Sequence, residues 1–144
     1  MTGTRIATRD GLSLAVTSFR DDGEPVLFVH GFSNDRFVWE DLALGLAPEY
    51  RGIAHDLRGH GDSDWSIERH YHLHDHASDL VAVLDGLGLE QVALVGHSLG
   101  GNVATLFASR HPERVSAVAL VDTGPALSAG GWRWAAADVS ALAP

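Results

Sequence analysis

Residues 92–104 read Val92-Ala93-Leu94-Val95-Gly96-His97-Ser98-Leu99-Gly100-Gly101-Asn102-Val103-Ala104. The first four are apolar and suit a buried strand, and a helix-compatible apolar pattern resumes at Asn102. Between them a serine stands in a G-x-S-x-G pattern, which is typical of a strained strand-to-helix turn that lifts the hydroxyl above the sheet edge. The stretch therefore predicts a strand, a sharp turn that carries Ser98, and a helix.

The residues around Ser98 also indicate what this turn binds. A Cβ at Gly96 or Gly100 would crowd a turn that holds Ser98 in a sparsely allowed backbone region, and Gly101 lets the following helix approach the strand. The helix N-terminus points unpaired N–H groups, and the positive end of its dipole, at the serine. We expect this site to receive an oxyanion.

The flanking sequence predicts alternating strands and helices. Asp10-Gly11 lies between two extended runs and predicts a hairpin, so that the chain opens with an antiparallel edge. A helix capped by Asp75 is expected to bury a stripe that continues to Leu87. Further segments are predicted as strands at 26–29, 51–57 and 115–121, and as helices at 35–46 (carrying Val38, Leu42 and Leu46) and 102–110.

This alternation predicts an α/β fold with a mostly parallel sheet, right-handed crossovers and helices on both faces. In such sheets, ligands bind at the carboxyl ends of the strands. Three features fall at those ends: His30-Gly31-Phe32, Ser98 and Asp122. We expect the functional site there.

Composition narrows the function classes. The chain has 144 residues, 45% of them hydrophobic, which suits one domain with a core. A formal net charge of −9 argues against nucleic-acid or anionic-membrane partners, and the absence of cysteine excludes disulfides and thiol catalysis. No leader or spanning segment is apparent, so a cytoplasmic location is expected. Every basic residue is arginine, which with abundant alanine and glycine suggests a bacterial source.

Three motifs in this order resemble the α/β-hydrolase family. They are His30-Gly31-Phe32, Asp56-Leu57-Arg58-Gly59-His60-Gly61-Asp62-Ser63 and Gly96-His97-Ser98-Leu99-Gly100-Gly101. The resemblance implies that residues 1–125 are the N-terminal part of a hydrolase core and that residues 126–144 begin a lid. It also implies that Trp132 and Trp134 are lid-packing aromatic residues, with an acyl pocket as the alternative role.

The resemblance further implies that Ser98 is the nucleophile and that the backbone N–H groups of Phe32 and Leu99 form the oxyanion hole. Small single-domain relatives of this kind include esterases, enol-lactone hydrolases, carbon–carbon bond hydrolases and cofactor-free perhydrolases. Serine at position 98 differs from the dehalogenase and epoxide hydrolase branches, which place aspartate there. The expected substrate is a small carbonyl compound, with no cofactor and no metal.

One part of the family pattern is missing. The family's chain order is serine, acid, then histidine, and its histidine follows strands that residues 1–144 do not include. Asp122 matches an acid position of some relatives, although a loop-capping role is favoured. His97, His30 and His60 are expected to pack or to shape loops rather than to act as the base.

Four histidines alternate along the chain at the start of the helix predicted at 75–87. They are His70, His72, His74 and His76. A metal site would need these rings to converge with a second shell of partners, and the family resemblance places them at an exposed helix entry. We expect a solvated surface.

The predicted strand at 115–121 would form an apolar sheet edge, which is a site of association. We therefore expect the active form to include a second polypeptide, most simply the C-terminal half of the same hydrolase. That chain would supply the catalytic histidine and the acid. The alternative is a non-catalytic half-domain or homodimer that binds a ligand or partner.

Overall fold

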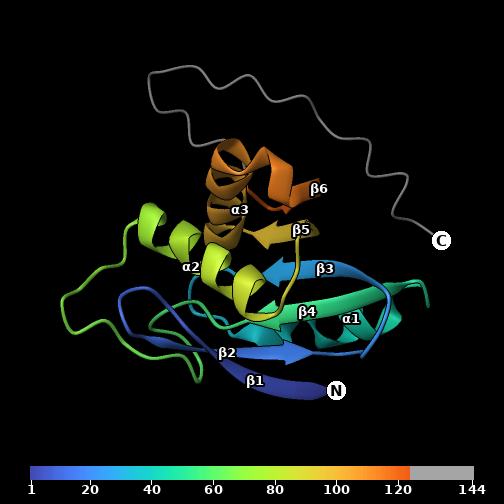
Figure 1. Cartoon of the computed structure of the whole chain (residues 1–144), viewed down its shortest axis with the longest axis horizontal. Coiled ribbons are helices and arrows are strands. Elements are labelled where there is room, and N and C mark those ends of the chain that lie inside the picture. Colours follow the sequence, from blue (N-terminus) through green and yellow to red (C-terminus); the bar gives the residue numbers. More distant parts are fainter. Residues whose placement is uncertain (124–144) are drawn as a thin grey trace.

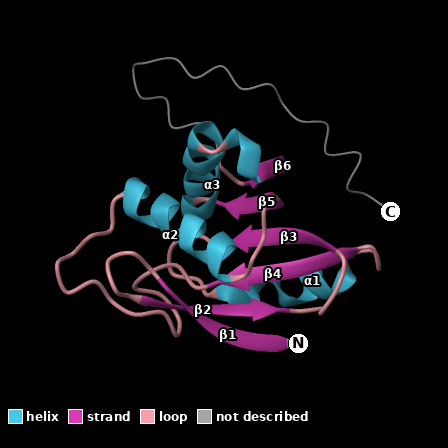
Figure 2. Ribbon diagram, viewed as in Figure 1, coloured by secondary structure: helices cyan, strands magenta, loops and turns pink. Residues whose placement is uncertain are grey.

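Residues 1–123 are described by the computed structural model, in which a six-stranded sheet is flanked by helices (Figures 1 and 2). The strands are β1 (Thr2–Ala7), β2 (Ser13–Ser18), β3 (Glu24–Val29), β4 (Tyr50–His55), β5 (Val92–His97) and β6 (Val115–Val121). The helices are η1 (Arg36–Trp39), α1 (Glu40–Gly45), α2 (Leu73–Gly86), α3 (Leu99–Arg110) and η2 (Pro112–Arg114).

The strand order is β1-β2-β4-β3-β5-β6. β2 pairs antiparallel with both β1 and β4, while β4, β3, β5 and β6 run parallel. The predicted α/β fold class and the antiparallel opening hairpin are therefore confirmed. The parallel strands all end at the same edge, on the left in Figure 1, where the long loop between β4 and α2 also lies.

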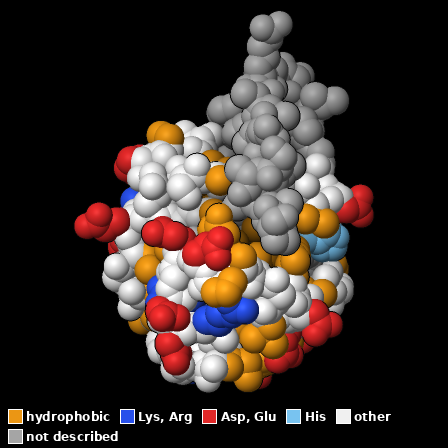
Figure 3. Space-filling view, turned by 90° about the vertical axis from the view of Figure 1, so that its right-hand side faces the viewer, with side chains coloured by type: hydrophobic (Ala, Val, Ile, Leu, Met, Phe, Trp, Pro, Cys, Tyr) orange, Lys and Arg blue, Asp and Glu red, His pale blue; other side chains and the backbone are white. Residues whose placement is uncertain are grey.

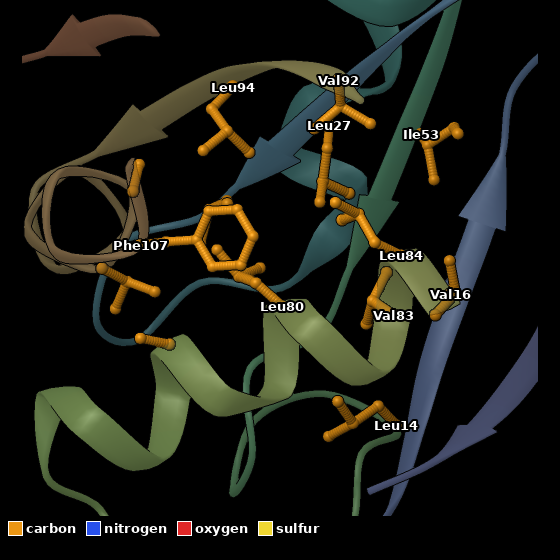
Figure 4. Close-up of a cluster of buried hydrophobic side chains, with 14 of the residues drawn as sticks. Leu14, Val16, Leu27, Ile53, Leu80, Val83, Leu84, Val92, Leu94 and Phe107 are labelled. Carbon is orange, nitrogen blue, oxygen red and sulfur yellow. The ribbon is translucent and has the colours of Figure 1, made fainter. Parts of the chain in front are cut away.

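Two apolar layers hold the helices against the sheet. On one face, α2 and α3 pack over β3, β4 and β5, and Figure 4 shows Leu80, Val83 and Leu84 of α2 pointing toward the strands. Phe107 of α3 enters the same cluster and is fully buried. On the other face, Trp39 and Ala43 pack against β3, β4 and β5. Both faces of the central strands are covered, as their continuous apolar sequence requires.

The first crossover helix differs from its prediction. Residues 35–46 form the 3₁₀ turn η1 and the short helix α1 instead of one continuous helix. Val38 and Leu42 are exposed, and the buried pair is Trp39 and Ala43. A Cβ at Gly52 would lie 2.6 Å from the Ala43 Cβ, so the smallest side chain of the helix is the one that fits against β4. Close backbone approach to Gly52 selects Ala43 for this face, beside the large apolar Trp39.

The start of α2 also differs from its prediction. His72 is the N-cap residue and Asp75 is the third helical residue, whose carboxylate accepts the His72 N–H at 2.8 Å. Asp75 thus satisfies an orphan donor at the helix start from inside the first turn. The helix ends before Gly88, whose φ of +66° suits glycine.

β6 lies at the edge of the sheet among the described strands, with β5 as its neighbour. It is far less buried than β5, and Leu120 and Val121 are 40% and 43% exposed. The predicted lid segment at 126–144, with Trp132 and Trp134, lies outside the described residues.

One face of the molecule agrees with the negative charge of the chain. Figure 3 views the amino ends of the parallel strands, where acidic side chains are more prominent than basic ones. In the part of the chain that the structure describes, no helix is both long enough and apolar enough to cross a bilayer.

Candidate active site

Ser98 occupies a strained turn between β5 and α3. Its backbone has φ 50° and ψ −114°, a left-handed region that non-glycine residues rarely adopt, and it is the N-cap residue of α3. Strain of this kind persists where the surrounding structure enforces it, often at functional sites. The predicted strand, turn and helix are confirmed.

The flanking glycines allow the turn to pack on the end of β3. A Cβ at Gly100 would lie 2.1 Å from the Val29 carbonyl oxygen, and a Cβ at Gly96 would lie 2.5 Å from the Gly100 oxygen. A Cβ at Gly101 would meet chiefly the Thr123 side chain, at 2.2 Å. The absence of a side chain at Gly101 therefore makes room mainly for Thr123, which follows β6. It also allows the close approach of α3 to β5 that the sequence predicted.

The segment after β3 lies directly against the serine. A Cβ at Gly31 would lie 3.3 Å from the Ser98 Cβ and 2.6 Å from Nδ1 of His97. Within residues 1–123, the N–H groups of Phe32 and Leu99 donate no hydrogen bond. Free amides beside a serine at a helix N-terminus have the chemistry of an oxyanion hole. Their assignment to that role stays a prediction.

A pocket of about 610 Å³ opens beside this turn. Phe32 and Leu99 form one part of its wall, and Trp65 and Tyr71, from the loop before α2, form another. His60 and His76 add polar atoms to this apolar lining. A largely apolar pocket with a few polar groups is typical of small-molecule sites.

Two buried ion pairs hold the loop that carries His60. Asp56 is fully buried, pairs with the Arg36 guanidinium, and accepts the N–H groups of Arg36 at 2.6 Å and Asp62 at 2.8 Å. Arg58 pairs with Asp79 of α2 through two bonds of 2.7 and 2.6 Å. The second sequence motif is thus a scaffold that ties the end of β4 to η1 and α2.

Burial disfavours both charges of the Arg58 and Asp79 pair. It raises the pKa of Asp79, and it opposes the charge of Arg58, whose pKa is nonetheless raised because Asp79 and Asp10 stabilise the guanidinium. We take the pair as ionised, since the two-bond geometry matches a charged fork on a carboxylate. The local sequence pattern did not signal this pair, because Asp79 is buried only once α2 packs on the sheet.

His30 serves the fold. His30 is fully buried; its Nε2 accepts the Leu57 N–H at 3.0 Å and its Nδ1 lies 2.8 Å from the Gly31 carbonyl oxygen. These contacts require a neutral ring with hydrogen on Nδ1. Burial also lowers the pKa of His30. The ring joins the ends of β3 and β4, which is the loop-shaping role expected from sequence.

No imidazole within residues 1–123 hydrogen-bonds to the Ser98 hydroxyl. The His97 ring lies against Gly31 instead, and Nδ1 of His60 lies 3.1 Å from the Arg58 carbonyl oxygen. Asp122 is exposed, with φ 46°, at the end of β6. The Asp122 side chain makes no hydrogen bond to the described residues. No contact in this part of the chain therefore supports either a catalytic acid or a loop cap at this position.

The four alternating histidines do not share one environment. His70, His72 and His74 are exposed, but His76 is buried on the inner face of α2. The expectation of a solvated surface is therefore wrong for His76. The helix begins at Leu73, so the alternation breaks and only the last ring turns inward. Among the described residues, no group of three or more potential ligands could hold a metal ion.

Two buried histidines should make stability depend on pH. Burial, with His30 and His76 nearby, lowers the pKa of His55 to about 3, and burial with Arg58 lowers that of His76 to about 4. Both rings bind a proton near pH 6.5 in the unfolded chain. Between pH 6.5 and the lowered pKa values, the unfolded state therefore binds more protons than the folded state. The free energy of unfolding falls as the pH drops through this range.

We expect a loss of about 2 kcal/mol per histidine between pH 6.5 and pH 5, at about 1.4 kcal/mol per pH unit. Urea denaturation at pH 7 and pH 5 measures it. His55→Met should remove the share of the dependence that His55 contributes, while His74→Met, at an exposed site on α2, should leave the dependence unchanged. Equal stability of the unmodified protein at both pH values would contradict the prediction.

Comparison with known proteins places this geometry in a family. Residues 24–136 match the family model described as the alpha/beta hydrolase fold. The chain belongs to the α/β-hydrolase family. The resemblance that the three motifs carried is thereby confirmed, together with the fold that it implied.

Several α/β-hydrolase relatives are 33–42% identical. A Bacillus subtilis (strain 168) protein whose name proposes 2-succinyl-6-hydroxy-2,4-cyclohexadiene-1-carboxylate synthase activity is 38% identical over 133 residues, 89% of this chain. Epoxide hydrolase 2 of Siraitia grosvenorii is 42% identical over 80% of the chain. An esterase structure from Exiguobacterium antarcticum matches 83% of the chain with a TM-score of 0.77 and 33% identity.

The chain spans only part of the length of these relatives. It covers 47% of the Bacillus subtilis protein, 36% of the Siraitia grosvenorii protein and 45% of the esterase chain. The names of these relatives cover a synthase, an epoxide hydrolase and an esterase.

Proposed function

We propose that this chain carries the nucleophile of a serine hydrolase that acts on an ester, a lactone or a related carbonyl compound. The observation that supports it is Ser98, held at φ 50° on the turn into α3, beside a pocket that Phe32 and Leu99 line. The small substrate would enter that pocket, with no cofactor and no metal.

The reaction proceeds in two halves. Ser98 Oγ attacks the carbonyl carbon, its proton passes to a base, and the N–H groups of Phe32 and Leu99 stabilise the negative oxygen that forms. The carbon–oxygen bond to the leaving alkoxide breaks as the base returns the proton to it, and an acyl ester remains on Ser98. Water then attacks that ester by the same route, which releases the acid and restores the serine.

Serine chemistry favours a carbonyl substrate over an epoxide. If Ser98 opened an epoxide, the product would be an ether, which has no carbonyl carbon for water to attack. An acyl ester on Ser98 has such a carbon and turns over. For this reason we propose ester or lactone chemistry, although several relatives and similar structures are named epoxide hydrolases.

We propose that the base, and with it the acid, come from a separate C-terminal chain that extends the sheet next to β6. The support is physical: His30, His60 and His97 are engaged elsewhere, and the apolar edge strand β6 leaves Leu120 and Val121 partly exposed. A strand added at this edge would cover them and would pair with unpaired backbone groups.

A fluorophosphonate probe with intact-mass analysis tests both proposals. We expect the label on the peptide that contains Ser98, in material that holds this 15.4 kDa chain together with a C-terminal partner chain. If a well-folded, monomeric 15.4 kDa protein reacts with the probe at Ser98, the proposal of a partner chain is contradicted. If no preparation is labelled and none hydrolyses an ester, the enzyme proposal is contradicted. That outcome would favour a half-domain that binds a ligand or partner.

A further inference from the structure

The pocket beside Ser98 contains one polar ring without a partner. The Tyr71 hydroxyl already accepts the Ser66 N–H at 2.8 Å, and Nδ1 of His60 is engaged by the Arg58 carbonyl oxygen. The His76 ring makes no hydrogen bond to any described residue, although the side chain is only 3% exposed. A buried polar group without a partner is costly unless a ligand or water satisfies it.

The orientation of the His76 ring follows from its two nitrogens. Nδ1 is fully buried without a partner. Nε2 lacks a partner too but is not among the fully buried atoms, and the side chain lines the pocket, so Nε2 is the nitrogen that reaches it. An unpaired buried N–H is rarer than an unpaired buried acceptor. The neutral ring therefore places its hydrogen on Nε2 and directs a donor into the pocket.

The described wall of the pocket offers no charged side chain for an ionic contact with a ligand beside His76. Of the described residues that line the pocket, none is Lys, Arg, Asp or Glu. The nearby Arg58 charge is matched by Asp79 and Asp10, and the other titratable groups near His76 are Asp75, His30, His55 and His60. Asp75 is bonded to the His72 N–H at the start of α2. An uncharged donor in an apolar wall suits an uncharged oxygen.

We propose that Nε2–H of His76 binds a second, uncharged oxygen of the substrate, a keto or hydroxyl group separate from the carbonyl that Ser98 attacks. The inference rests on the proposed function and narrows its substrates to oxygenated esters or lactones. His76 is a specificity residue and takes no part in bond cleavage.

Two esters that differ only by one ketone provide the test. Methyl 4-oxopentanoate and methyl pentanoate are titrated into the ¹⁵N-labelled Ser98→Ala protein, in the assembly in which it is purified, and the imidazole nitrogen resonances are followed. We expect the free protein to show the neutral His76 ring with its hydrogen on Nε2. The Nε2 resonance should shift only when the keto ester is added. That ester should bind about fivefold more tightly than methyl pentanoate, which is the gain that one neutral hydrogen bond provides.

Matched variants separate recognition from packing. His76→Phe should bring the affinity ratio to about 1, and His76→Gln, which keeps an N–H donor, should restore part of it. His74→Phe, an exposed site on the same helix, should keep the full ratio. Equal affinities in the His76-containing protein, or a preference that survives His76→Phe, would overturn the inference.

The two hypotheses fail independently. If His76→Phe does not fold, the response of the Nε2 resonance in the His76-containing protein decides the question. Absence of a fluorophosphonate label on Ser98 would overturn the serine hydrolase but would leave this binding measurement readable, because Ser98→Ala performs no chemistry.

Discussion

Ser98→Ala is expected to lower ester hydrolysis by the assembled enzyme about 10⁴- to 10⁶-fold. Alanine keeps the Cβ, so the strained backbone at φ 50° and the approach of Gly31 stay as they are, and only the hydroxyl is lost. Without it no acyl ester forms, and the remaining rate reflects binding and the oxyanion hole alone. Steady-state hydrolysis of a chromogenic ester measures the loss.

Ser78→Ala is the matched control for this loss. Ser78 is exposed on α2 and its hydroxyl bonds the His74 carbonyl oxygen at 2.9 Å, so its removal should leave hydrolysis within about twofold. The thermal midpoints of both variants should match that of the unmodified protein. More than a tenth of the activity left in Ser98→Ala would show that another residue is the nucleophile.

Asp79→Ala is expected to cost about 3 to 5 kcal/mol of unfolding free energy, because it leaves the buried Arg58 charge without its main partner. The Arg58 and Asp79 side chains are 2% and 1% exposed, and Asp10, at 3.0 Å on the other side of the guanidinium, is itself partly exposed. Urea denaturation at pH 7 measures the cost.

Two further variants separate charge burial from packing. Replacing both partners, Arg58→Met with Asp79→Leu, should recover most of the loss, since no charge then stays buried unpaired. Asp85→Ala, in the same helix, removes an exposed carboxylate that lies 2.8 Å from Arg114 and should cost less than about 1 kcal/mol. If Asp79→Ala and Asp85→Ala cost the same, the buried pair does not hold α2 to the loop.

Local sequence was sufficient for the turn that carries Ser98. Gly96 and Gly100 exclude side chains from a crowded turn, and the apolar run before them forms a strand in any parallel sheet of this kind. The hairpin around Gly11, which has φ +85°, was equally readable, because turn chemistry acts between neighbours in the chain.

Pairings across long sequence separations were not readable. Asp56 and Arg36, or Arg58 and Asp79, are about twenty residues apart, and nothing in the local pattern distinguishes them from surface charges. His76 was wrongly grouped with its exposed neighbours for the same reason. The phase of α2 about its axis, which is set by packing on the sheet, decides which of the histidines turns inward.

By itself, the sequence determined the α/β fold, the strained turn at Ser98 and the family, because each depends on hydrophobic periodicity or on the backbone freedom of glycine over a few residues. Only the tertiary structure decided that Trp39 and Ala43 face the sheet, that the Arg58 charge is buried, and that His76 lines the pocket beside Ser98. Burial and partner choice depend on which elements meet in space, and that is a property of the packed chain as a whole.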